Sequence, residues 1–371
     1  MNIAIDVSNT AQFRTGTEEY IEGLVFGLNR AGVQVVGIGR AAQALLPDQP
    51  RLGLSLRESP SPITKWWWEY YGIRRAPQDV DLLHIPFMAH PERRLAVPSV
   101  VTVHDLIPFR LQQYRKNIKE RRYFAHIERA LPHADQLVAI SEATMADIQE
   151  LYPEWASRTV VIPNGVHPDF FQEVDLDQIN QVTRRYGLRQ HPRVLYAGGY
   201  DERKNVGTLI QAMAEVFQHR PDGELVLVGA QDNLGVRRML GEWRSLEGRV
   251  IVTPFVSRSD LVTLYHSADL FVYPSRYEGF GMPPAQALAV GVPVVSSDIP
   301  SIREVVKDYG VLVNPESVEA WVDAIGRMLD SPATAQRLVQ EGQAHAQNFA
   351  WESIARRYLE VYRDVVKRRR G

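Results

Sequence analysis

Apolar and polar positions alternate along the chain in two regular ways, as short apolar runs and as longer stretches with helical spacing. The runs are rich in Val, Ile and Leu, are four to seven residues long, and are typical of buried strands. They cover 3–7, 33–38, 81–85, 100–104, 134–140, 193–197, 224–228, 249–252 and 269–273. Stretches with helical spacing lie between them, and 18–28 and 206–217 are the clearest. This alternation predicts an α/β fold with parallel sheets covered by helices.

The stretch from Tyr273 to Asp298 carries the strongest local signal. Gly279 and Gly281 flank Phe280, so the backbone can turn sharply there. Pro283 and Pro284 suit the first turn of a helix, and Gly291 suits its C-terminal cap. The pattern predicts a helix N-terminus at a glycine-lined loop beside Glu278, which would attract an anion such as a phosphate. The alternative is an ordinary strand-to-helix connection whose glycines serve only for turning.

These residues resemble the signature of glycosyltransferase family 4, the retaining sugar-nucleotide enzymes of the GT-B fold. The matching positions are Glu278, Gly279, Phe280, Gly281 and Pro283, with Met282 inside the same donor-binding loop. In the family the first Glu lies beside the donor sugar and a second Glu holds the ribose, but position 286 here is Gln. Gln286 still hydrogen-bonds a ribose without charge. The expected cost is about tenfold in donor affinity, because charged hydrogen bonds contribute about 1.5–3 kcal/mol against about 0.5–1.5 for neutral ones.

A second glycine-rich turn precedes the helical stretch 206–217. It reads Gly198-Gly199-Tyr-Asp-Glu-Arg203-Lys204-Asn205, and glycines with cations before a helix suit a diphosphate. The family resemblance places a donor-binding Lys at 204 and often an Arg at 199, where this chain has Gly. Arg203 is the candidate replacement. Surface Lys and Arg without a ligand are the alternative. By the same resemblance, the backbone at Phe255 and Val256 meets the nucleobase.

The resemblance also assigns residues in the first half of the chain. His104 ends the strand 100–104 and matches the family's His-Asp motif, whose His touches the donor sugar or its diphosphate. Gly16 occupies the place of the glycine that approaches the donor phosphates or the acceptor. The alternatives are a structural histidine and a flexible turn. The three residues expected to act in catalysis are thus His104, Glu278 and Lys204.

The GT-B fold implies two doubly wound, Rossmann-like domains that face each other across a cleft holding the site. We expect domains at 1–165 and 166–349, a linker at 165–179, and a final helix at 350–371 that packs back on the first domain. His104 and Gly16 would form one wall of the cleft. Lys204, Glu278 and the loop 279–283 would form the other.

Several other patterns carry less weight. The run 37–42 imitates a dinucleotide fingerprint, but it follows the second strand and is soon broken by prolines. The aromatic run 65–71 is interpreted as a helix packed on the sheet, with an acceptor- or membrane-facing surface as the alternative. The basic stretch 109–131 and the tail 367–370 are interpreted as solvated faces, with contact to anionic lipid or a phosphate-bearing acceptor as the alternative. Asp175 and Asp177 lie in the linker, so we assign no metal to them.

Composition limits the function classes. The net charge is −2, which gives no reason to expect nucleic acid as a partner. The chain has no cysteine and hence no thiolate site or disulfide. It begins directly in a strand, with no signal-peptide pattern and no apolar run of about 20 residues. We therefore expect a cytoplasmic protein that contacts the inner membrane face at most peripherally.

The resemblance implies transfer of a hexose, with retention, from a nucleotide-diphosphate sugar to a glycan or polyprenol-linked acceptor, without a metal or cofactor. Mannose from a GDP donor is the expected sugar, because the wording of 198–205 is similar to that of bacterial mannosyltransferases of surface polysaccharide synthesis. Two alternatives stay open. One is another GT-B enzyme, such as a sugar-nucleotide epimerase or a phosphorylase. The other is a non-catalytic scaffold, supported by Gln286 and Gly199.

Overall fold

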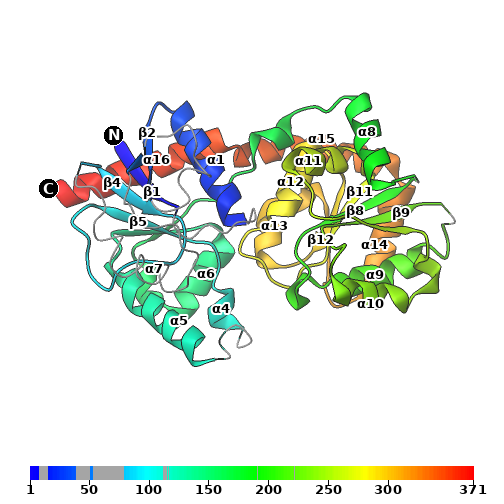
Figure 1. Ribbon diagram of the computed structural model, residues 1–371, viewed down its shortest axis with the longest axis horizontal. Helices are drawn as coiled ribbons and strands as arrows, with labels where there is room; N and C mark the ends of the chain where they lie inside the picture. The colour runs from blue at the N-terminus through cyan, green and yellow to red at the C-terminus, as the bar shows by residue number, and fades with distance from the viewer. Residues whose placement is uncertain are drawn as a thin grey trace. The chain divides into compact units, whose positions relative to one another are not determined.

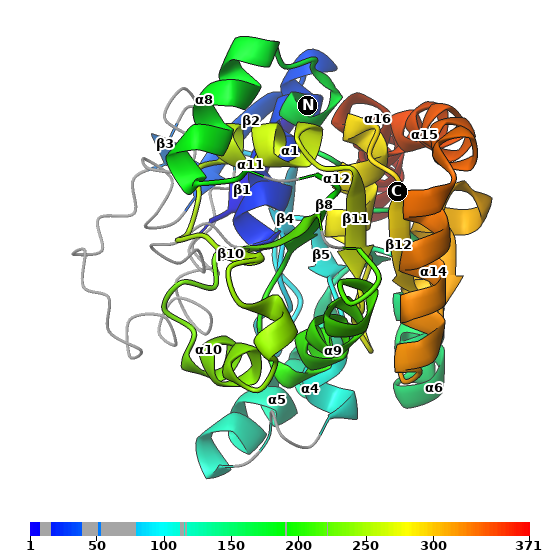
Figure 2. The ribbon, with the colours of Figure 1, turned by 90° about the vertical axis from the view of Figure 1, so that its right-hand side faces the viewer.

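The structure is a computed structural model that describes residues 1–7, 16–38, 51–52, 79–111, 115, 117–189, 191–220 and 222–371. These residues form two compact units, the N-terminal unit (Met1–His167 with Phe349–Gly371) and the C-terminal unit (Pro168–Asn348). Each unit is a parallel sheet with helices on both faces (Figure 1, Figure 2). The predicted pair of doubly wound sheets is therefore confirmed. The aromatic run 65–71 and residues 39–42 of the imitated fingerprint lie outside the described residues.

The sheet of the N-terminal unit has seven strands in the order β3-β2-β1-β4-β5-β6-β7. Its strands are β1 (Asn2–Asp6), β2 (Gln34–Ile38), β3 (Arg51–Leu52), β4 (Leu82–Ile85), β5 (Ser99–Val103), β6 (Gln136–Ala139) and β7 (Thr159–Val161). The chain first builds outward from β1 through β2 to β3 and then crosses to β4 on the other side of β1. The topological switch point, where ligands bind in such sheets, thus lies between β1 and β4.

Six α-helices of this unit lie among the described residues, and side chains cap the N-termini of two of them. The six helices are α1 (Gly16–Arg30), α4 (Ile107–Arg110), α5 (Ile118–Ala130), α6 (Glu142–Leu151), α7 (Pro153–Ala156) and α16 (Trp351–Arg370). The Ser141 hydroxyl accepts from the Thr144 N–H and caps α6. Asn117 and Glu120 form a reciprocal capping box at the start of α5.

The final helix α16 packs on α1 inside the N-terminal unit. Glycines at 23 and 27 leave a groove on α1, since a Cβ at Gly23 would lie 1.8 Å from Nε1 of Trp351. The basic end of α16 is exposed at Lys367, Arg368 and Arg370, as expected of a solvated face, but it also makes specific contacts. Three consecutive arginines bind other parts of the unit. Arg368 donates to the Gln136 side chain, Arg369 to the Leu95 carbonyl and Arg370 to Asp81.

The sheet of the C-terminal unit has six strands in the order β10-β9-β8-β11-β12-β13. They are β8 (Arg193–Ala197), β9 (Glu224–Val228), β10 (Val250–Val252), β11 (Leu270–Tyr273), β12 (Val294–Ser297) and β13 (Val311–Val313). Every pair is parallel, and the switch point lies between β8 and β11.

Eight helices cover this sheet among the described residues of the unit. They are α8 (Leu176–Tyr186), α9 (Val206–Val216), α10 (Leu234–Gly241), α11 (Arg258–His266), α12 (Met282–Val290), α13 (Pro300–Val306), α14 (Val318–Asp330) and α15 (Pro332–Ala346). The expected linker 165–179 is only partly irregular, because α8 begins at Leu176. Asp175 accepts from the Gln178 N–H and is the N-cap of this helix, which explains the acid without a metal.

Candidate active site

The predicted site residues of the C-terminal unit gather at its switch point. Gly198 and Gly199 follow β8, and Ser275 to Glu278 follow β11, its neighbour in the sheet. The carboxyl ends of parallel strands share one edge of the sheet, so the two loops approach each other. The Arg276 N–H donates to the Arg203 carbonyl at 2.7 Å and ties the loops together.

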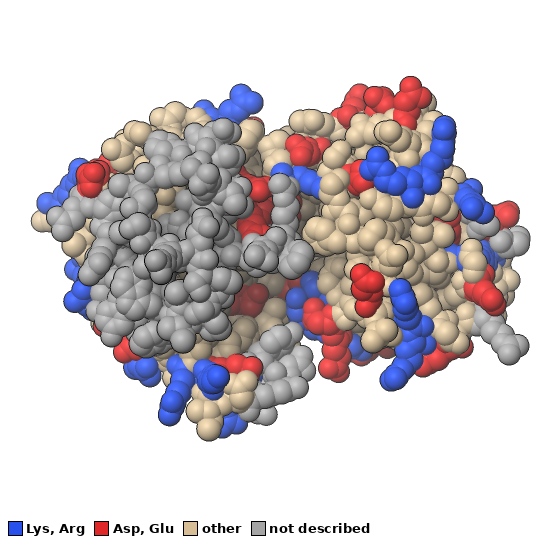
Figure 3. Space-filling view, viewed as in Figure 1, with Lys and Arg blue, Asp and Glu red and all other residues tan. Residues whose placement is uncertain are grey.

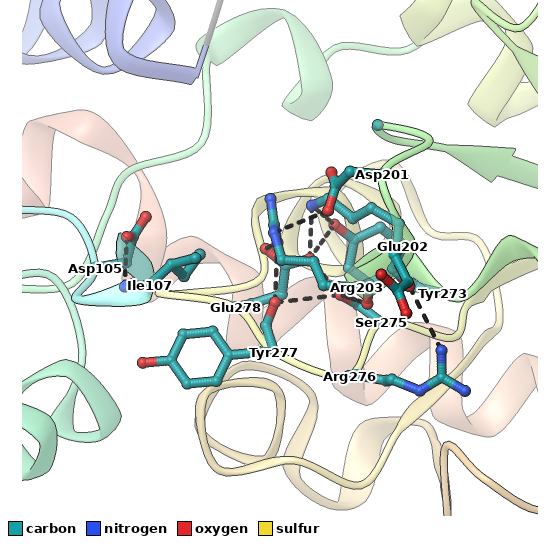
Figure 4. Close-up of polar contacts among 12 residues, drawn as sticks. Asp105, Ile107, Asp201, Glu202, Arg203, Tyr273, Ser275, Arg276, Tyr277 and Glu278 are labelled. Atoms are coloured by element: carbon teal, nitrogen blue, oxygen red, sulfur yellow. Dashed lines mark hydrogen bonds and ion pairs between the residues drawn. The ribbon is translucent and has the colours of Figure 1, made fainter. Parts of the chain in front are cut away.

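Glu278 is the centre of this cluster. Its Oε1 accepts from Nζ of Lys204 at 2.6 Å, from the Tyr273 hydroxyl at 2.8 Å and from the Ser275 hydroxyl at 2.6 Å. Its Oε2 accepts from the guanidinium of Arg203 at 2.9 Å (Figure 4). A carboxylate oxygen has two lone pairs. Oε1 is thus fully used by protein groups, whereas Oε2 has room for one further donor.

The charges of the cluster do not cancel. Burial raises the pKa of the Glu278 carboxyl, but Lys204 and Arg203 outweigh burial, and the pKa ends below its ordinary value. Glu278 is therefore ionised at neutral pH. Lys204 and Arg203 face Glu278 in the interior, and the side chains of Lys204 and Glu278 are about nine-tenths buried. The carboxylate that balances the second cation, Asp201, is 44% exposed. Within the buried part of the cluster positive charge is therefore in excess and is poorly screened by water, which suits a phosphate group.

Arg203 and Lys204 are adjacent in sequence, yet both reach Glu278. They belong to a single 3₁₀ turn, Glu202–Lys204, that precedes α9. The guanidinium of Arg203 also donates to the Tyr277 carbonyl at 2.9 Å and pairs with Asp201 at 3.2 Å. A second cation is therefore present although Gly199 stands where the family often has Arg.

The glycine turn after β8 is packed too tightly for larger residues. A Cβ at Gly198 would lie 2.8 Å from the Tyr196 hydroxyl and 3.1 Å from the Tyr273 ring. The Tyr196 hydroxyl donates to the Gly199 carbonyl at 2.5 Å, which fixes the turn. Asn205 closes it: its side-chain amide donates to the carbonyls of Pro274 and Pro315.

The start of α12 has the predicted geometry. Gly281 adopts φ +112°, a conformation that favours glycine, and no side chain caps the helix. Gly291 ends it at φ +88°, as predicted for the C-terminal cap. Pro283 and Pro284 carry no N–H, so this helix end presents the backbone N–H groups of Gly281 and Met282 to an anion.

Three further predicted residues lie apart from Glu278 in the fold. Gln286 is buried on α12, with the Tyr265 hydroxyl 3.4 Å from its Oε1. Phe255 and Val256 follow β10, the edge strand next to β9. The Phe255 side chain is 71% exposed, whereas Val256 is buried. The exposed Phe255 ring, which lies next to the buried Val256 in the chain, can stack on a planar group.

His104 and Gly16 belong to the N-terminal unit. Nε2 of His104 lies 2.8 Å from the Pro86 carbonyl, and because a carbonyl only accepts, Nε2 carries the proton. Burial lowers the pKa of His104 despite this bond, so the ring is neutral at pH 7 and Nδ1 is an acceptor. Such a nitrogen suits a sugar hydroxyl better than a phosphate oxygen. Gly16 is the first residue of α1, and a Cβ there would meet nothing within 4 Å.

The sequence did not identify two residues that donate hydrogen bonds to Glu278. Tyr273 was recognised only as the end of a strand, yet its buried hydroxyl contacts both Lys204 and Glu278. Ser275 was not singled out at all. The available signal was a polar aromatic residue at the carboxyl end of an otherwise apolar strand, two residues before Ser275.

The described surface shows no broad single-sign field on the visible face of the C-terminal unit, where basic and acidic side chains are interspersed (Figure 3). Basic side chains gather along the lower edge of the N-terminal unit, where α5 lies. No group of three or more His, Asp or Glu residues within the described ranges is arranged to hold a metal ion. Likewise, none of the described helices combines the length and apolarity needed to cross a bilayer.

Comparison with known proteins finds relatives for both units. A family described as "Glycosyltransferase Family 4" matches residues 14–170, and "Glycosyl transferases group 1" matches residues 183–345. O-antigen chain mannosyltransferase B of Escherichia coli is 30% identical over 267 residues, which cover 71% of this chain and 70% of the relative. D-inositol 3-phosphate glycosyltransferase of Xylanimonas cellulosilytica is 32% identical, over 65% of this chain and 60% of the relative. The match thus spans less than two thirds of the second relative's length.

Solved structures with low sequence identity share the fold. Sucrose-phosphate synthase from Thermosynechococcus elongatus has a TM-score of 0.76 at 24% identity, with 98% of each chain covered. Anabaena Alr3699/HepE, solved in complex with UDP and glucose, has a TM-score of 0.77 at 19% identity, with 98% of this chain and 100% of the other covered. These likenesses confirm two Rossmann-like domains of the GT-B class.

Proposed function

This chain belongs to glycosyltransferase family 4, and we propose that it transfers a hexose, with retention and without a metal, from a nucleotide-diphosphate sugar to a glycan or polyprenol-linked acceptor. The observation that carries the proposal is the buried Glu278 paired with both Lys204 and Arg203 at the switch point of the C-terminal sheet. A site whose buried charge is mainly positive, beside an uncapped helix N-terminus, suits a diphosphate.

The difficult charge in this reaction builds on the departing diphosphate. Lys204, Arg203 and the N–H groups of Gly281 and Met282 would stabilise it. One well-placed donor in a water-poor site contributes about 3–4 kcal/mol to such a transition state. Glu278 would hold the two cations and accept one sugar hydroxyl on Oε2. We do not assign it covalent attack, because its pairing with Lys204 and Arg203 lowers the pKa of the carboxyl and makes the carboxylate a weaker nucleophile.

His104 is proposed to accept a hydrogen bond from a sugar hydroxyl through its unprotonated Nδ1. Gln286 is proposed to meet the ribose, Phe255 and Val256 the base, and Gly198, Gly199 and Gly16 the phosphates. These roles follow the family resemblance. Mannose from a GDP donor is the proposed sugar, supported by the names of relatives such as the O-antigen chain mannosyltransferase.

The acceptor is proposed to be phosphate-bearing or lipid-linked, with the protein meeting the inner membrane face only peripherally. The support is α5, whose Lys119, Arg121 and Arg122 are exposed. Co-sedimentation with phosphatidylglycerol vesicles tests the contact, and equal sedimentation of the Arg121→Glu, Arg122→Glu double variant would contradict it.

A donor screen tests the proposal. A nucleotide sugar that binds raises the unfolding temperature in proportion to its affinity. We expect GDP-mannose to give the largest rise, followed by release of GDP when acceptor extract is added. Chelation with EDTA should leave the rate unchanged, and the product anomer, read by NMR, should match the donor. Binding without GDP release under any acceptor would favour a non-catalytic scaffold.

A further inference from the structure

A cluster of polar side chains is buried inside the apolar core of the N-terminal unit. It consists of Tyr20, His84, Thr102, Tyr358 and Tyr362, and each is 0% exposed. We call it the tyrosine cluster. Its members come from α1, β4, β5 and α16, and they lie among apolar residues such as Ile5, Leu24 and Leu359. Apolar side chains would fill this core without the need for matched hydrogen bonds, so the cluster requires a reason.

The cluster forms one connected chain of hydrogen bonds. Tyr362 contacts Nδ1 of His84, whose Nε2 lies 2.8 Å from the Thr102 hydroxyl. Thr102 lies 2.9 Å from the Tyr20 hydroxyl, which donates to Tyr358 at 2.7 Å. Burial lowers the pKa of His84 to about 3, so its ring is neutral. If each member donates to the next, from Tyr362 through His84 and Thr102 to Tyr20 and Tyr358, each bond has a donor and an acceptor.

Tyr20 alone among these residues also faces the proposed sugar-binding histidine. The edge of one ring meets the face of the other, with centroids 4.9 Å apart and planes at 88° between Tyr20 and His104. The His104 ring is thus held on one side by Tyr20 and at Nε2 by the Pro86 carbonyl. Among the described residues no group is hydrogen-bonded to its Nδ1, which is the atom proposed to meet the ligand.

We infer that Tyr20 is a positioning residue for His104: Thr102 and Tyr358 hold the Tyr20 hydroxyl, and the Tyr20 ring holds the imidazole with Nδ1 toward the substrate. The inference rests on the proposed role of His104. It also gives the last helix a function, since Tyr358 of α16 fixes the Tyr20 hydroxyl from the opposite end of the chain. The competing explanation is that the cluster only docks α16 onto the sheet.

Two variants of Tyr20 separate these explanations. Tyr20→Leu removes the ring and the hydroxyl, whereas Tyr20→Phe keeps the ring and removes the hydroxyl. We expect kcat to fall at least tenfold in Tyr20→Leu and a few-fold in Tyr20→Phe, with the donor KM changed less than twofold. Tyr362→Phe is the matched control, because it removes a hydroxyl from the same cluster but leaves the partners of the Tyr20 hydroxyl, which are Thr102, Tyr358 and His84, in place. It should lower Tm about as much as Tyr20→Phe and leave kcat unchanged.

The readout independent of activity is the ¹⁵N spectrum of protein labelled at histidine. His104, assigned with His104→Gln, should show the tautomer with the proton on Nε2 in the wild type and in Tyr362→Phe. In Tyr20→Leu we expect this signature to shift toward the average of both tautomers, with a smaller shift in Tyr20→Phe. If Tyr20→Leu does not fold, Tyr20→Phe against Tyr362→Phe decides the question.

The possible outcomes for the Tyr20 and His104 variants can be told apart. A His104 signal and a kcat that stay unchanged in both Tyr20 variants, while Tm falls, would overturn the inference and leave only the docking role. Unchanged turnover in His104→Gln would instead refute the proposed role of His104. The tautomer signature would still report whether Tyr20 positions the ring.

Discussion

The two units of this protein each contain a buried polar cluster beside a parallel sheet, but the clusters differ in charge. The tyrosine cluster of the N-terminal unit uses hydroxyls and a neutral imidazole. The cluster of the C-terminal unit uses Lys204, Arg203 and Glu278, all charged. The two units thus provide one neutral and one charged buried environment.

The difference follows from what each cluster is proposed to hold. A phosphate needs fixed positive charge, and burial strengthens the attraction because little water screens it. A sugar hydroxyl needs an oriented neutral acceptor. The tyrosine cluster is proposed to orient His104 through Tyr20, and burial lowers the pKa of both His84 and His104, so that neither ring is charged. Burial therefore strengthens a charged phosphate site in one cluster and keeps imidazoles neutral in the other. The neighbouring side chains decide which of the two effects results.

The strongest test of the charged cluster is Lys204→Ala. Loss of one charged hydrogen bond should weaken binding of a nucleoside diphosphate about 10- to 100-fold, because such a bond contributes about 1.5–3 kcal/mol. Turnover should fall about 100-fold or more, since the leaving diphosphate loses a donor. Calorimetry and a nucleotide-release assay measure the two effects.

The control for this variant is Arg327→Ala on α14, which removes the same charge from an exposed pair with Asp323. It should change neither quantity. Unchanged nucleotide affinity in Lys204→Ala would show that the diphosphate lies elsewhere, and the comparison of the two clusters would then lose its basis.

Glu278→Gln should separate turnover from binding. The amide keeps the size of the side chain but no longer neutralises the two cations, so nucleotide affinity should stay equal or rise. Turnover should fall about 100-fold, because Lys204 and Arg203 lose the group that orients them. Glu316→Gln, which disturbs only the exposed pair with Arg276, is the control. Parallel losses of affinity and turnover would mean that Glu278 simply binds the donor.

The neutral state of His84 in the tyrosine cluster should be measurable in how the free energy of unfolding depends on pH. The pKa of His84 is about 3 in the folded chain against about 6.5 when unfolded. Because the folded pKa is depressed, the stabilisation is complete above about pH 6.5 and is lost progressively as the pH falls toward 3. One such group changes the free energy of unfolding by at most about 1.4 kcal/mol per pH unit.

The window from pH 6.5 to 5 isolates the histidines, because Glu278, whose pKa is lowered, stays ionised there. His84→Gln should flatten the slope of stability in this window, measured by urea unfolding. His90 is a second buried histidine, with a pKa near 4, and lies outside the cluster. His90→Gln should flatten the slope to a similar degree while leaving kcat unchanged. A slope unaltered in His84→Gln would show that this ring titrates normally.

The smallest expected effect is that of Gln286→Glu, which restores the second Glu of the family pattern. Gln286→Glu introduces a carboxylate at a buried position where the Tyr265 hydroxyl is the nearby donor. Nucleotide affinity should rise up to about tenfold, as a charged acceptor replaces a neutral one at the ribose. The free protein should lose Tm, because the charge is desolvated, and should regain it with GDP. A fall in affinity would place Gln286 away from the ribose, and Gln286→Leu gives the baseline.

Much of the fold could be predicted from local patterns in the sequence. The apolar runs at 193–197 and 224–228 coincide with β8 and β9. Ser141, Gly281 and Gly291 mark helix ends through side-chain and backbone preferences that act within a few residues. The signature around Glu278 likewise lies in one short segment, so Glu278 and its glycines were identified from the sequence.

Other features depend on residues far apart in the chain. The sequence alone did not predict that Arg203 and Lys204 both turn toward Glu278, because that requires a loop from β11 to lie against a turn from β8. The tyrosine cluster joins Tyr20 to Tyr358, and the arginines at the end of α16 bind Asp81 and Gln136. Local preference and periodicity, which act between near neighbours, are determined by the sequence itself. Only the packing of sheets and helices decides which buried polar groups contact each other, and therefore which buried groups remain charged.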